Sequence, residues 1–194
     1  MATTPTRPAP ASADASPADA ADAAAAADTV AASPPVAAAG SDGSALSSQA
    51  KIVELADHLS ACADQLHERV LKEIRSYGGK PVPENVQDKA RALLEDETLL
   101  RQRANGLYAD AAAYIVKGLG KPQAHLVKLT ADAAEKIRKI GVIGEVTGLV
   151  GGLLTLAGAA ATGQPLAILA AIEKVEKHGK ALDALKPKPP VKAG

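Results

Sequence analysis

Glu54, His58 and Cys62 follow one another at intervals of four residues, which places them on one face of a helix. Carboxylates, imidazoles and thiolates are all zinc ligands, so this row is a candidate metal site. Such a site needs three or four converging ligands, however, and Cys62 also falls within a row of apolar residues. His67 faces roughly the opposite side of the same helix from His58. The sequence therefore predicts a core cysteine beside surface histidines, with no metal and no other cofactor.

The Gly-Leu-Gly-Lys run at 118–121 resembles part of a phosphate-binding loop. The Walker pattern requires another glycine where this chain has Ile115, and it follows a strand, whereas this run follows a predicted helix. We interpret the run as a helix terminator. No serine stands beside a histidine and an acid in a nucleophile elbow, and nothing singles out a catalytic pair of carboxylates. The sequence therefore predicts that the protein is not an enzyme.

Gly144, Gly148 and Gly152 recur every four residues in the most apolar part of the chain. Leu156 and Ala160 continue this row at the same spacing. Small residues at this spacing let two helix backbones meet at close range, as they do in many membrane proteins. We therefore predict that the row is a helix-packing or membrane-insertion face.

The apolar segment from Ile140 to Thr162 is long enough to span a bilayer, with Glu145 as its only charge. Lys136, Arg138 and Lys139 stand immediately before it and resemble a membrane-proximal basic cluster. Lysines also follow the apolar region, so the positive-inside rule gives no orientation.

The same segment also suits the centre of a soluble bundle. Each glycine in a helix costs about 1 kcal/mol relative to alanine, and a protein core recovers that loss by close packing as well as lipid does. A turn signal at 162–165 would fold residues 140–172 into an apolar, Gly-rich hairpin. Membrane insertion of this hairpin and a purely soluble core both remain open.

Apolar residues recur at intervals of three and four along the rest of the ordered region, which predicts amphipathic helices. The first helix starts after a cap at Ser47 or Ser48 and ends at Gly78 and Gly79. The last runs from Leu166 to Leu185, after Pro165.

The second helix follows the Lys-Pro-Val-Pro-Glu loop and continues past Ile115 to Gly118. Its Glu97 and Arg101 are expected to form an exposed pair on a solvated face. The third helix starts near Pro122. We predict an all-α fold, an antiparallel bundle of three long helices and one shorter C-terminal helix.

Composition divides the 194 residues into three parts. Residues 1–48 are rich in Ala, Pro, Ser and Asp and are predicted to be a disordered tail. Residues 49–186 form the helical bundle. Residues 187–194 form a basic, Pro-rich tail, whose minimal PxxP motif is a weak match to a partner-domain ligand.

Charge and aromatic content narrow the partners. The net charge is zero, and there is no Phe or Trp, so neither a basic face nor base-stacking rings indicate nucleic-acid binding. The N-terminus has no apolar core of a conventional signal peptide, which leaves cytoplasmic residence or a non-classical export route open, with membrane association possible.

The sequence therefore predicts a non-enzymatic helical protein that associates with membrane lipid or self-assembles through the Gly-rich hairpin, such as an exported effector or a pore-forming, translocator-like protein. A protein partner is also compatible with it. The alternative is a soluble helical-bundle interaction module, such as a scaffold, chaperone or granule-coat protein.

Overall fold

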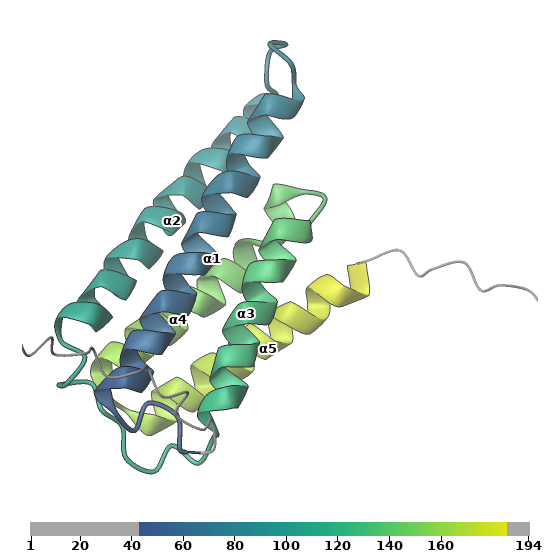
Figure 1. Ribbon diagram of the computed structural model, residues 1–194. Helices are drawn as coiled ribbons and strands as arrows, with labels where there is room; N and C mark the ends of the chain where they lie inside the picture. Colours follow the sequence, from purple (N-terminus) through teal and green to yellow (C-terminus); the bar gives the residue numbers. More distant parts are fainter. Residues whose placement is uncertain (1–42, 186–194) are drawn as a thin grey trace, which may run out of the picture. The chain divides into compact units, whose positions relative to one another are not determined.

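The computed structural model describes residues 43–185, which lie within the second of the chain's two units, residues 39–194. The described part is a helical bundle of five α-helices and one short 3-10 helix, with no named strand (Figure 1). The predicted all-α bundle is confirmed. The elements are α1 (Gln49–Ser76), α2 (Glu84–Ala109), α3 (Gln123–Lys139), η1 (Ile143–Glu145), α4 (Thr147–Thr162) and α5 (Pro165–Leu185).

α1 and α2 form an antiparallel hairpin (Figure 1). Ser48 caps α1 by accepting a hydrogen bond from the backbone N–H of Lys51, and Gly78 and Gly79 take positive φ after its end. In the contacts between the two helices, later residues of α1 pair with earlier residues of α2. The pairs that set this register are Tyr108 with Asp57 at 2.6 Å, Arg101 with Asp64 at 2.8 Å and His67 with Glu97 at 3.8 Å.

The remaining helices cover this hairpin, since α3 packs against α1 and α5, and α4 packs against α2 and α5. The Gln123 side chain donates to the Glu54 carboxylate at 2.7 Å, near the start of both α3 and α1. Further along, the Cys62 thiol donates to the Thr130 carbonyl at 3.4 Å. α1 and α3 therefore run parallel. This is expected because α2, which lies between them in the sequence, runs in the opposite direction.

The packed structure begins before residue 49, the position at which the composition of the chain predicts the bundle to start. Ala45 and Leu46 are fully buried. The Ala45 N–H donates to the Lys121 carbonyl at 2.7 Å, and the Leu46 carbonyl accepts from the Val116 N–H at 2.9 Å. Composition misses these residues because backbone hydrogen bonds hold them. Residues 1–42 of the predicted tail, and the predicted tail 187–194, lie outside the described residues.

α2 ends at Ala109, earlier than predicted, although apolar residues continue beyond it. Asp110 ends the helix, and the following connection buries Val116 and Leu119 without helical spacing. Gly118 and Gly120 both take positive φ in this connection. The Gly-Leu-Gly-Lys run is therefore part of a loop before α3 rather than the direct end of α2.

The chain leaves helical geometry between α3 and α4, where the sequence suggested one continuous apolar arm from Ile140. Arg69 on α1 is only 7% exposed and binds this junction. Its Nε donates to the Ile140 carbonyl at 2.9 Å, its Nη2 donates to the Gly141 carbonyl at 2.6 Å, and Glu73 pairs with it at 2.9 Å. The guanidinium thus satisfies carbonyls that the end of α3 leaves without helical partners.

One hydrophobic cluster runs through all five helices and is built from Ala, Leu, Ile and Val, together with Cys62. α4 is the most apolar helix and is buried over most of its circumference. Gly163 takes a left-handed φ of 65° at its end, and α5 begins at Pro165. The predicted turn and the predicted last helix are confirmed, and α4 and α5 form the hairpin.

We expect Arg69→Ala to lower the free energy of unfolding by about 2–3 kcal/mol, because buried carbonyls lose charged donors. Urea titration followed by far-UV circular dichroism measures the loss. Arg103→Ala is the control, since Arg103 is exposed on α2, and it should change stability by less than about 0.5 kcal/mol. Equal losses in the two variants would contradict this role for Arg69.

Candidate functional site

The predicted glycine row does not lie on one helix. Gly144 belongs to η1, where an added Cβ would lie 3.2 Å from the Lys89 side chain of α2. Gly148 and Gly152 lie on α4 and face α5 instead. The break at η1 changes the direction of the row, so the three glycines do not form one continuous packing stripe.

Gly148 and Gly152 contribute to packing inside the molecule. An added Cβ at Gly152 would lie 3.3 Å from the Cα of Val175, and one at Gly148 would lie 2.5 Å from Nδ1 of His178. The first distance is tighter than an ordinary Cβ contact, so Val175 would have to shift by a few tenths of an ångström, and the second requires the His178 side chain to move. The other members of the row, Leu156 and Ala160, are fully buried.

The basic residues before the hairpin are engaged in ion pairs. Lys136 pairs with Asp183 of α5 at 2.8 Å. Arg138 and Lys139 both pair with Glu135, one turn back on α3. All three cations stand in the last turn of α3, where the negative end of the helix dipole favours them. Lys136 therefore links α3 to α5, and the other two lie on the α3 surface.

Across residues 43–185, none of the helices has both the length and the hydropathy that crossing a bilayer requires. α4 holds only part of the predicted apolar segment 140–162, because the chain is not α-helical at 140–146. Association of the hairpin with lipid stays a prediction.

Cys62 occupies the core, as the apolar row predicts. Burial raises the pKa of its thiol to about 12, so the thiol is neutral near pH 7. Glu54, its distant neighbour in the row, is bound to Gln123. Within the described residues, no three His, Cys, Asp or Glu side chains converge as a metal site requires.

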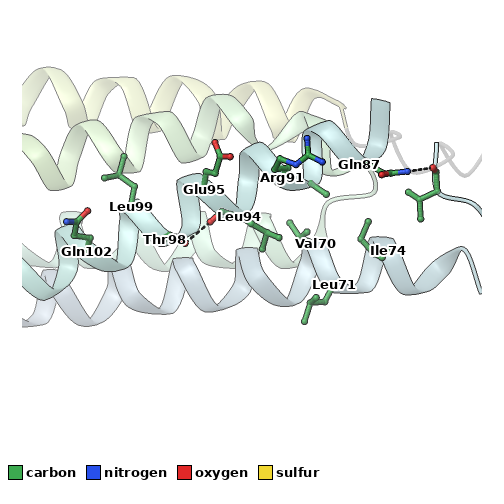
Figure 2. Close-up of a pocket in the computed structure, with 12 residues that line it drawn as sticks. Val70, Leu71, Ile74, Gln87, Arg91, Leu94, Glu95, Thr98, Leu99 and Gln102 are labelled. Carbon is green, nitrogen blue, oxygen red and sulfur yellow. Dashed lines mark hydrogen bonds between the residues drawn. The ribbon is translucent and has the colours of Figure 1, made fainter. Parts of the chain in front are cut away.

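A groove lies between α1 and α2, and Figure 2 shows the side chains that line it. It offers about 930 Å³, and its walls come only from these two helices and the connection between them. Val70 and Ala90 are buried at its floor, whereas Leu99 is 38% exposed. Its other apolar side chains are partly buried, namely Leu71, Ile74, Val82 and Leu94. We take this α1/α2 groove as the candidate functional site.

Two charges stand on the α2 edge of the groove. Arg91 and Glu95 are one helical turn apart, and Leu99 follows one turn later (Figure 2). Arg91 pairs only loosely with Asp88, at 3.7 Å between two well-exposed side chains. Among residues 43–185, Glu95 has no ion-pair partner. The groove thus combines an apolar floor with one cation and one anion at its rim.

A polar cluster centred on buried Glu97 joins α1 to α2 beside the groove. Glu97 is only 7% exposed, which corrects the predicted solvated pair. It binds Arg101, as the spacing predicts, and it also faces His67 of α1. Arg101 reaches Asp64 of α1 as well, and its hydrogen bond to Glu97 is the main cause of its raised pKa. The prediction failed because Glu97 stands within the buried row of Leu93, Leu100 and Ala104.

Sequence reasoning missed the groove. Leu71, Leu94 and Leu99 each follow or precede a buried apolar residue in the sequence, namely Val70, Leu93 and Leu100. An apolar residue next to a stripe widens the apolar face beyond what a single neighbouring helix covers. These pairs of neighbouring apolar residues were the feature of the sequence that indicated a wider apolar face. They could not show which side of α1 and α2 no other helix covers.

Comparison of the chain with protein-family models, curated proteins and solved structures finds no match.

Substitution of two glycines in α4 should separate close packing from helix propensity. An added Cβ at Gly158 meets nothing within 4 Å, so Gly158→Ala should stabilise the protein by roughly 0.5–1 kcal/mol. In Gly152→Ala the new Cβ presses on Val175, and this contact should cancel the gain in helix propensity. Gly152→Ala should therefore unfold at a lower urea concentration than the wild type. Equal stabilisation by both changes would show that α4 and α5 do not approach closely at Gly152.

The Cys62 thiol should resist labelling in the folded protein. Its pKa of about 12 lies far above the assay pH, and the thiolate is the reactive form. Reaction with a disulfide reagent at pH 8 should be negligible without denaturant and complete in concentrated guanidinium chloride. Rapid labelling of the native protein would contradict the buried position.

Proposed function

We propose that this protein is a non-enzymatic helical interaction module that binds an amphipathic helix of a protein partner in the α1/α2 groove. The observation that carries the proposal is a partly open apolar groove made by one helical hairpin. Leu99 is exposed to 38% at its rim, and Leu71, Ile74 and Leu94 are only partly buried. Burial of such side chains drives helix-in-groove recognition.

The dimensions suit a short helix. The α2 wall runs from Gln87 to Gln102, which corresponds to about 22 Å along a helix axis. A partner helix of about four turns spans this length and would present apolar residues at intervals of three, four and seven. Gln87 and Gln102 at the two ends supply polar groups that such a helix can meet.

The chemistry of the groove supports contact rather than reaction. Its lining holds no His, Cys, Ser or Tyr. Its one hydroxyl, on Thr98, donates to the Leu94 carbonyl at 2.9 Å. The two charged side chains, Arg91 and Glu95, stand on the rim. A surface of this kind offers apolar area and a polar border, as the cores and rims of protein interfaces do.

The test uses a displayed library of amphipathic helical peptides, selected on the full chain. The strongest peptides are then titrated against the wild type, Leu99→Asp and the control Leu166→Asp. Leu166 lies on α5, outside the groove, and is 82% exposed. Leu99→Asp should weaken binding at least about tenfold, since a charge would enter an apolar contact, whereas Leu166→Asp should leave binding unchanged.

Circular dichroism of both variants confirms that they fold. Failure to select any helical peptide would overturn the proposed function. Peptides that bind Leu99→Asp as tightly as the wild type would overturn the assignment of the groove.

A further inference from the structure

We propose that the surface which covers the groove belongs to a second copy of this chain, in a two-fold dimer of α1/α2 hairpins. This inference rests on the proposed function and names the partner. The two grooves pack face to face about an axis that crosses α1 and α2 at right angles. Each α2 then lies antiparallel to the α2 of the other copy, and the four helices enclose the two apolar floors.

The register within the hairpin fixes where such an axis passes. The pairs His67 with Glu97 and Arg101 with Asp64 bring together residues whose levels on α1 and α2 match. Continuing this register toward the tip of the hairpin places Leu71 level with Leu93 and Leu94. An axis at this level brings Leu71 near its own copy, and Leu94 lies beside the axis on α2. Both are partly exposed apolar residues of the groove.

The rim charges complement themselves about the same axis. Arg91 and Glu95 lie on either side of the level of Leu93, each about half a helical turn away. Rotation about the axis therefore sets Arg91 against Glu95 of the second copy, and Glu95 against its Arg91. In a two-fold interface each contact occurs twice in this reciprocal way. No other charged side chain lines the groove.

Both charges are available for this exchange. Arg91 and Asp88 are 3.7 Å apart and largely exposed, so their pair contributes little in the monomer. Glu95 has no ion-pair partner within the described part of the chain. Together with burial, its charge raises the pKa of the neighbouring Asp96. A guanidinium from a second copy would pair with a carboxylate that makes no ion pair with Arg91, its neighbour one helical turn away.

The experiment is sedimentation of the full chain over a range of concentrations, for the wild type, Arg91→Glu and Glu95→Arg. The wild type should form a dimer. Each single change places like charges opposite each other twice and should weaken the dimer at least about tenfold. The double variant Arg91→Glu/Glu95→Arg restores opposite charges and should return to the wild-type association.

A mixture of the two single variants gives the sharpest result. Arg91→Glu carries a glutamate at both 91 and 95, and Glu95→Arg carries an arginine at both. The two variants should therefore form a heterodimer with each other, although each alone should form only a weak homodimer. The charge changes lie at exposed positions, and circular dichroism checks the fold of each variant.

A wild type that stays monomeric at every concentration would overturn the dimer. A dimer that is equally strong in both single variants would place the interface elsewhere. Neither outcome depends on the peptide selection, so a chain that binds selected helices in the groove but stays monomeric loses this inference and keeps the proposed function.

Discussion

α4 and α5 approach each other closely at Gly152, and the other helices pack around this pair. With no Phe or Trp in the chain, the core must be filled by aliphatic side chains, and helices must lie near one another to leave no voids. A Cβ added at Gly152 would lie 3.2–3.4 Å from side-chain and backbone atoms of Val175, closer than an ordinary contact. This contact closes the α4–α5 hairpin and lets α2 and α3 pack around it. The glycines cost helix propensity, and the tight packing that they permit offsets that cost.

The α4–α5 hairpin packs against the other helices, and α4 is buried over most of its circumference. Of the glycines that suggested lipid insertion or self-assembly, Gly148 and Gly152 face α5 and Gly144 faces Lys89 of α2. Lys136 of α3 extends across to Asp183 of α5. Apolar side chains are also partly exposed along α1 and α2, whose hairpin carries more apolar residues than its neighbours cover, while Leu166 and Leu185 of α5 are exposed as well. The α1/α2 groove follows from this excess, and the proposal of an interaction module depends on the groove rather than on the glycines.

Buried polar side chains complement the apolar packing by fixing how the helices are placed. Arg69 holds the junction between α3 and α4 against α1 through two backbone carbonyls. Gln123 joins Leu46, Lys51 and Glu54, and so connects the segment before α1 to the start of α3. Glu97 joins α2 to α1 through Arg101 and His67. Small aliphatic side chains can slide past one another at low cost, whereas an unpaired buried polar group is expensive. These contacts thus favour one register of the helices and with it one geometry of the groove.

The helical class, a cap at Ser47 or Ser48, the turn at 162–165, the last helix and the core position of Cys62 were predictable from the sequence, because each depends on local spacing or on a residue's own conformational preference. Contacts between distant parts of the chain set the end of α2 at Ala109 and the break after Lys139, since Leu46 and Arg69 bind the loops that follow these helices. Tertiary structure also decided that Glu97 is buried, and that Leu71, Leu94 and Leu99 face a groove rather than another helix. Exposure depends on which helices pack against a given face, and periodicity within one helix carries no information about the neighbour that covers it.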